Sequence, residues 1–168
     1  MKREKLSALA HASHPVAAPI SDAGVDEVLA RVVAHAPRSV LDVGCGSAQW
    51  LIRLLQRLPD ARGVGVDVSA VALATAAEQA DVARVRDRLT LHEMSAEQLP
   101  HDEHDAVLCI GSTHALGGLA GTFAALHRWA FSRAVAVVGD GFWERPPQRD
   151  FRGWWKGWCS GSRRATRA

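Results

Sequence analysis

The residues best suited to chemistry lie in the segment VLDVGCGSA, Val40 to Ala48, of this 168-residue chain. Gly44 and Gly46 allow the backbone to turn sharply after an apolar strand, and they let a ligand approach where a side chain would collide. The helix expected next directs its free amide groups and the positive end of its dipole toward such a ligand. Asp42, near the carboxyl end of the strand, can face a cationic ligand. A glycine pair taken alone is equally compatible with an ordinary strand-turn-helix.

A second acidic residue, Asp67, ends the next expected strand, 23 residues after Gly44. An acid at about this spacing, roughly 20 residues in dinucleotide-binding folds, accepts hydrogen bonds from ribose hydroxyls. The alternative is a helix-capping aspartate, but Ser69 is already well suited to cap the helix that follows. The glycine turn and Asp67 together predict a nucleoside ligand.

The residues beside the turn favour a cationic nucleoside over a dinucleotide. The dinucleotide fingerprint has a third small residue where this chain has Gln49, followed by the bulky Trp50. A pyrophosphate anion would also be poorly served by Asp42. S-adenosylmethionine (SAM) carries a cationic sulfonium and no phosphate. The sequence therefore predicts SAM, with an NAD(P)-binding oxidoreductase as the more distant alternative.

Four motifs in order give a resemblance to class I SAM-dependent methyltransferases. Val40 to Trp50 resembles their first motif, with Ala48 where a third glycine is common, and Gly63 to Ser69 resembles the second. Met94 to Pro100 resembles the third and Asp105 to Gly118 the fourth. The resemblance implies a SAM-dependent methyltransferase acting on an unidentified small-molecule acceptor. It implies these cofactor-binding residues: Asp42, Gly44, Cys45, Gly46, Asp67, Val68, Ser95, Ala96, Glu97, Ile110 and Gly111.

Methyl transfer requires alignment of the acceptor and exclusion of water more than it requires a base. His114, just after the fourth expected strand, is the candidate catalytic residue, as a base or a substrate contact, and a polar loop histidine is its alternative. His14, Trp143 and Glu144 are weaker candidates on segments that could cover the pocket. The competing function is a catalytically inactive SAM-binding fragment.

Two further site types are disfavoured. Ile110 to Thr113 lacks the Asn/Asp-Pro-Pro-aromatic run that amino methylation of bases usually shows. The charged loop with His101, Asp102 and His104 is expected to be solvated, and no metal site is expected.

The motifs require alternating strands and helices to position them. We expect strands at 39–43, 63–67, 89–93, 105–110 and 134–138, and a helix after the fourth strand with Leu119, Phe123, Leu126 and Ala130 on one face. Right-handed crossovers then give a Rossmann-like α/β three-layer sandwich with a parallel sheet in the order 3-2-1-4-5. The family's final antiparallel hairpin is expected to be missing. The fifth strand would then be an open edge through which a homodimer could form.

Composition excludes other classes of protein. No run approaches the roughly 18 apolar residues of a membrane span, and no secretory signal is expected. Three cysteines without metal-ligand spacing favour a reduced, cytoplasmic setting. The net charge of +2 divides into +4 for residues 150–168 and therefore −2 for residues 1–149. A body without basic character argues against nucleic-acid binding.

Three regions are expected along the chain. Residues 1–20 would be an N-terminal lid or flexible segment, 21–147 the SAM-binding domain, and 148–168 an irregular, basic, tryptophan-rich tail. The tail has no helical or strand period. It is expected to be either frame-shifted sequence or a disordered basic tail that touches acidic partners or membrane lipid headgroups. The segments SHPVAAPIS and VVGDGFWERPP resemble those of a group of small bacterial methyltransferases. Truncation at the C-terminus is expected because the strands that usually follow in class I methyltransferases are missing.

Overall fold

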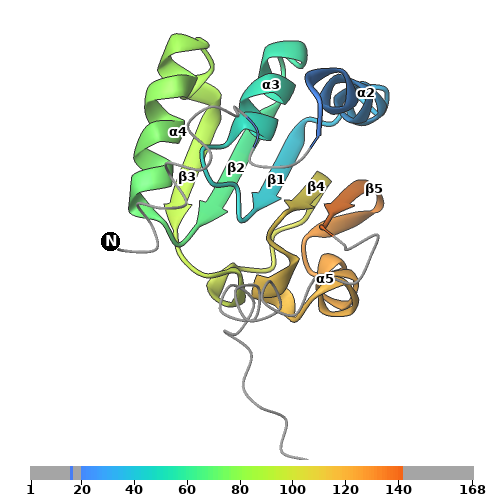
Figure 1. Cartoon of the computed structure of the whole chain (residues 1–168). Coiled ribbons are helices and arrows are strands. Elements are labelled where there is room, and N and C mark those ends of the chain that lie inside the picture. Colours follow the sequence, from blue (N-terminus) through green and yellow to red (C-terminus); the bar gives the residue numbers. More distant parts are fainter. Residues whose placement is uncertain (1–15, 17–19, 142–168) are drawn as a thin grey trace, which may run out of the picture.

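The computed structural model describes Val16 and residues 20–141, which form one open sheet with helices on both faces (Figure 1). The strands are β1 Ser39–Val43, β2 Arg62–Asp67, β3 Leu89–Glu93, β4 His104–Ile110 and β5 Ala130–Gly139. All neighbouring strands are parallel, and their order is β3-β2-β1-β4-β5. The expected α/β fold and strand order are confirmed. Within the described residues, β5 pairs only with β4 and lies at the edge of the sheet.

Four α-helices within the described part of the chain complete the layers. Helices α2 Asp22–Val33, α3 Gln49–Arg57 and α4 Ala70–Val82 lie on one face, and α5 Leu119–Leu126 lies on the other (Figure 1). Three short 3₁₀ turns, η1 Arg86–Arg88, η2 Ala96–Gln98 and η3 Thr113–Leu116, connect them. Ser21 and Ser69 cap α2 and α4, since their hydroxyls accept hydrogen bonds from Gly24 N and Ala72 N at 3.2 and 3.3 Å. Serine is a favoured N-cap residue, and the cap at Ser69 agrees with the sequence prediction.

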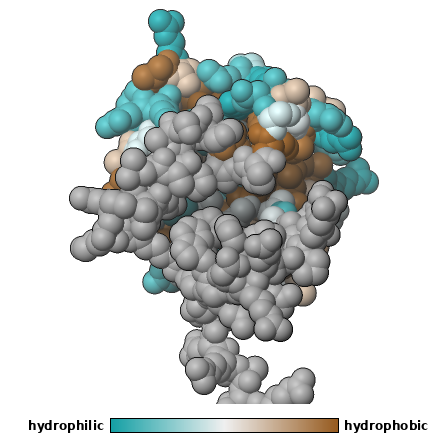
Figure 2. All heavy atoms as spheres, viewed as in Figure 1, coloured by the Kyte–Doolittle hydropathy of each residue, from teal (hydrophilic) through white to brown (hydrophobic). Residues whose placement is uncertain are grey.

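Each face of the sheet has its own apolar core because side chains alternate along the strands. Val40 and Leu108 pack with α2, α3 and α4, whereas Leu41 and Val107 pack with α5 and the buried Trp129. The outward surfaces of the helices at the top of Figure 2 are mostly hydrophilic, and apolar side chains gather nearer the middle of the view. Burial of both faces explains the nearly continuous apolar sequence of β4.

The structure corrects the prediction for α5. Leu119 and Phe123, expected on the buried face, are 48% and 62% exposed, and Ala130 begins β5 instead of extending the helix. The buried residues of α5 are Thr122, Ala125 and Leu126. The Thr122 hydroxyl donates to Gly118 O at 3.0 Å, so this polar side chain is buried without an unpaired donor. Apolar spacing was therefore correct for Leu126 and wrong for Leu119, Phe123 and Ala130.

The end of α5 also explains the length of β5. Trp129 N donates to Leu126 O at 3.0 Å, and its indole nitrogen donates to Pro100 O at 3.0 Å. These bonds hold the chain where β5 starts, four residues before the predicted Ala134, and the pairing shifts register between His104 and Ala106.

Several expectations lie outside the described residues. These are most of the segment 1–20, the tail 148–168, and the weaker candidates His14, Trp143 and Glu144. Among the residues that the structure describes, no helix is both long and apolar enough to cross a membrane.

Candidate functional site

The turn after β1 is attached to the end of β2. Gly44 N and Cys45 N both donate to Val66 O, at 2.7 and 3.0 Å. The turn then passes through positive φ values at Gly44, Gly46 and Ala48, of 75°, 54° and 55°. The left-handed conformation of Ala48 explains why a glycine is common at this position in the resembled motif.

The two glycines of the turn have different surroundings. A Cβ built on Gly44 would lie 2.3 Å from Ser112 Cβ, whereas a Cβ on Gly46 would meet no atom of a described residue within 4 Å. We expected a side chain at Gly44 to collide with a ligand, but the structure shows that it would collide with Ser112. Gly46 is the residue with open space beside it, where a ligand can approach the backbone.

Asp67 connects β2 to the turn. Its Oδ2 accepts a hydrogen bond from Gly46 N at 2.8 Å, and its Oδ1 accepts one from Ser69 N at 2.9 Å. Asp67 therefore supports the chain entering α4 while Ser69 caps the helix, so the two roles weighed for it are not exclusive. Each carboxylate oxygen retains capacity for a further hydrogen bond. A ribose contact remains a prediction.

Asp42 is buried in the middle of this arrangement. Its Oδ2 has no hydrogen-bond partner among the residues that the structure describes. Burial, together with the nearby charge of Asp67, raises the pKa of Asp42 to about 7. A buried carboxylate in this position is destabilising unless it gains a proton or a cationic partner. The same factors raise the pKa of the Cys45 thiol, first through burial and then through Asp42 and Asp67, so Cys45 is a protonated core side chain.

The end of β4 lies against the turn through a residue that the sequence analysis did not select. The buried Ser112 hydroxyl donates to Val43 O at 2.5 Å and lies 3.3 Å from Cys109 Sγ. Burial raises the pKa of the Cys109 thiol, so this sulfur is also uncharged. A small polar residue two positions after an apolar strand was the available sequence signal for Ser112.

The remaining candidates lie at the side of the sheet where the strands have their carboxyl ends, which we call the carboxyl edge. Val68 is exposed after β2, Gly111 has a φ of 74° after β4, and Ile110 is partly buried. Ser95 caps η2 through a reciprocal bond with Gln98, Ala96 is buried, and Glu97 is exposed. His114 is exposed on η3, which lies against η2. The structure thus places every described candidate at one edge, and hydrogen bonds join Asp67 to Gly46 within it.

The sequence of this chain also matches a known protein family. The family described as "Methyltransferase domain" matches residues 40–130, more than half of the chain. The chain therefore belongs to the methyltransferase domain family and has its class I fold, which confirms the resemblance inferred from the four motifs.

Individual relatives agree with this assignment. The chain is 32% identical over 106 residues to methyltransferase ungE' of Aspergillus campestris, covering 62% of the chain and 31% of that protein. It is 33% identical over 120 residues to trans-aconitate 2-methyltransferase of Acidovorax sp., covering 67% of the chain and 42% of that protein. The chain thus spans less than half the length of these curated relatives.

A solved structure is similar over most of the chain. The SAM-dependent methyltransferase of Geobacter sulfurreducens, crystallised with S-adenosyl-L-homocysteine, has a TM-score of 0.77 and 26% identity. The match covers 87% of this chain and 59% of that one. The product of methyl donation by SAM is therefore bound in a protein with this fold.

Proposed function

We propose that the chain binds SAM and transfers its methyl group to a small-molecule acceptor. The observation on which this rests is the buried Asp42 Oδ2, which lacks a hydrogen-bond partner within residues 20–141. It lies near the turn where, among the same residues, the space beside Gly46 is open. A cation provides the partner that this oxygen lacks, and SAM carries its positive charge on a sulfonium and an amino group. An anionic dinucleotide phosphate would meet repulsion from Asp42 and Asp67.

The residues of the carboxyl edge fit the parts of this cofactor. Asp67 has free acceptor capacity for the ribose hydroxyls, and Ser95, Ala96 and Glu97 border the predicted adenine position. Ile110 and Gly111 line the methyl-transfer position at the end of β4. SAM supplies a methyl carbon already activated by its sulfonium, so the residues of the chain chiefly orient the reactants and exclude water.

The acceptor is bound, in this proposal, over the ends of β4 and η3, with His114 as a contact or a base. The name of the Acidovorax relative offers one acceptor chemistry, a carboxylate of trans-aconitate. A hydroxyl or amine acceptor is the other chemistry that SAM-dependent transfer serves, and it requires removal of a proton.

Purified protein provides the test of this function. Calorimetric titration with SAM, S-adenosyl-L-homocysteine and NADH tests the cofactor, and incorporation of tritiated methyl into the small molecules of a bacterial extract tests transfer. We expect binding of SAM and its product, no binding of NADH, and incorporation of label. SAM binding without incorporation would instead support a SAM-binding domain that lacks activity. NADH binding without SAM binding would support an oxidoreductase.

Two further proposals concern the bounds of the domain and the cellular location of the protein. We assign residues 21–147 to the SAM-binding domain, and we place the protein in the cytoplasm because Cys45 and Cys109 are buried free thiols. Limited proteolysis with mass spectrometry tests the domain bounds, and cell fractionation tests the location.

A further inference from the structure

Asp140 stands directly after β5, beside the chain that leaves β4. The last pair of the β4–β5 ladder joins Ile110 to Gly139, and Gly111 N donates to Gly139 O at 2.8 Å. Asp140 therefore lies next to the residues that line the proposed methyl-transfer position. Asp140 belongs to the segment VVGDGFWERPP, but the sequence alone indicated no role for it, because pairing of β5 with β4 is what brings it to this position.

A buried hydroxyl orients the Asp140 carboxylate. The Thr113 hydroxyl donates to Asp140 Oδ2, and Gly141 N donates to Asp140 Oδ1 at 2.8 Å. Thr113 is only 2% exposed, whereas Asp140 is exposed. Each oxygen of the carboxylate thus accepts one hydrogen bond from the protein, and its remaining acceptor capacity is open to a ligand.

The same contacts connect Asp140 to the cofactor turn. Thr113 follows Ser112, whose hydroxyl donates to Val43 O at 2.5 Å immediately before Gly44. Asp140, η3 and the glycine turn are therefore held in a fixed relation by two hydroxyls, as a group that must meet both cofactor and acceptor requires.

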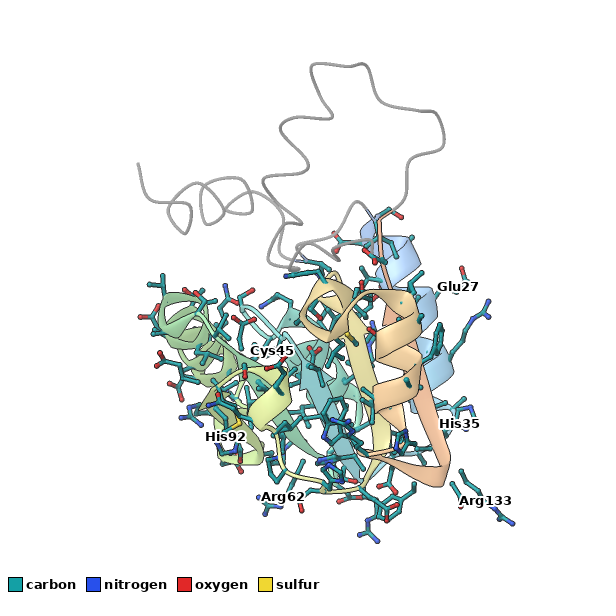
Figure 3. All side chains as sticks on the ribbon, turned by 90° about the horizontal axis from the view of Figure 1, so that it is seen from below. Glu27, His35, Cys45, Arg62, His92 and Arg133 are labelled. Atoms are coloured by element: carbon teal, nitrogen blue, oxygen red, sulfur yellow. The ribbon has the colours of Figure 1, made fainter. Side chains whose placement is uncertain are left out.

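The charges around Asp140 leave it available. The described arginines lie on helices, in the segments before strands, or near strand starts. Figure 3 shows Arg62 and Arg133 along one margin of the molecule, away from Cys45 in its interior. Among the described residues, none of the three ion pairs includes Asp140. A ligand at this edge therefore meets a carboxylate that no described cation neutralises.

We propose that Asp140 is a catalytic residue that accepts a hydrogen bond from the acceptor, and that the acceptor class is one with a proton on its reacting oxygen or nitrogen, not a carboxylate. This inference rests on the proposed SAM-dependent transfer. An ionised carboxylate acceptor has no proton to offer and is repelled by Asp140.

The step that follows balances in charge and atoms. As the acceptor heteroatom bonds to the methyl carbon, the carbon–sulfur bond breaks and its electron pair stays on sulfur. The proton of the acceptor passes to the Asp140 carboxylate, from which water removes it. Thr113 acts as a positioning residue, because its hydroxyl donates a hydrogen bond to Asp140 Oδ2.

The test compares Asp140→Asn with Asp140→Glu, Thr113→Val and the control Asp60→Asn. Asp60 is an exposed aspartate between α3 and β2, at the opposite edge of the sheet, so its replacement makes the same chemical change away from the site. Tritiated methyl transfer into the small molecules of a bacterial extract is followed, and products are treated with alkali, which releases methanol from methyl esters only. The Kd for SAM is measured for every variant.

We expect mainly alkali-stable products and a rate for Asp140→Asn lower by about 100-fold, within the range for loss of a general base. Asp140→Glu should recover part of the rate, Thr113→Val should be intermediate, and SAM affinity should stay within about twofold. Asp60→Asn should match the wild type. Equal rates for wild type and Asp140→Asn, or mainly alkali-labile products, overturn this inference and leave SAM-dependent transfer standing. A wild type that binds SAM but transfers nothing overturns both, and one that does not bind SAM overturns the cofactor assignment.

Discussion

Ser112 and Gly44 are in contact across the ends of β4 and β1, where a Cβ added to Gly44 would lie 2.3 Å from Ser112 Cβ. The Ser112 hydroxyl also donates to Val43 O, 69 residues earlier in the chain. Gly44 is therefore required by packing within the protein, and Gly46 by the space left for a ligand.

The two glycines predict two different defects. Gly44→Ala should lower the free energy of unfolding by about 2–4 kcal/mol, because the methyl group overpacks Ser112 and the φ of 75° is unfavourable for alanine. Gly46→Ala should cost about 1–2 kcal/mol of stability through its positive φ alone, and should chiefly weaken SAM binding. Urea unfolding and SAM titration separate the two effects. Partial recovery of stability in Gly44→Ala/Ser112→Gly is the control, and equal stability losses for the two single variants would contradict this assignment.

Asp67 predicts a combined loss of affinity and order in the turn. Asp67→Ala should weaken SAM binding by about 1–3 kcal/mol, because it removes a charged hydrogen-bond acceptor, and it should also destabilise the fold by leaving Gly46 N and Ser69 N without their partner. Asp67→Asn keeps one oxygen acceptor and should be milder in stability. Calorimetry and urea unfolding are the measurements, with Asp60→Asn as control. SAM binding at full strength in Asp67→Ala would show that the ribose is placed wrongly.

Asp42 predicts a stability that falls as pH rises. Its pKa is about 7 in the folded protein against the ordinary value of 3.8, so between these values the folded chain binds more protons than the unfolded chain. The free energy of unfolding then decreases through this window and stays reduced above it. Asp42→Asn should remove a contribution on the order of 2–4 kcal/mol between about pH 4 and pH 8. The difference between wild-type and variant urea curves isolates this group, and parallel curves would be evidence against a buried, protonated Asp42.

The same residue predicts how SAM affinity depends on pH. A cationic ligand favours the ionised form of Asp42, so below about pH 7 the binding of SAM must release the proton of Asp42. The Kd for SAM should therefore rise as the pH falls, by up to about tenfold per pH unit. Asp42→Asn should bind SAM more weakly and without this dependence. Titration in buffers of different ionisation enthalpy detects the released proton. A pH-independent Kd in the wild type would remove Asp42 from the cofactor site.

The outer edge of β5 predicts self-association. Within the described residues β5 has a neighbour on one side only, and Ala136 is exposed on it. An apolar edge strand pairs readily with another chain. We expect a concentration-dependent dimer by light scattering, and Ala136→Lys should shift it to monomer. Ala74→Lys, at an exposed position of α4, is the matched control. A wild type that is monomeric at all concentrations would rule out this dimer.

Local sequence patterns determined much of this fold. The cap at Ser69, the glycine turn and the strand order were all predicted, because capping and turn chemistry depend on adjacent residues and right-handed crossovers restrict the topology. The location of the candidate cofactor residues was also predictable, because all strands of a parallel sheet have their carboxyl ends on the same side of the sheet.

Only the tertiary structure decided what each of these residues contacts. The sequence could not show that Gly44 faces Ser112, that Asp67 binds Gly46 N, or that Thr113 orients Asp140. It also indicated the buried face of α5 only in part, since Leu126 is buried as predicted whereas Thr122 is buried and Phe123 is exposed. These relations depend on the packing of segments that are distant in the chain, and a local period carries no information about the neighbour that a side chain will meet.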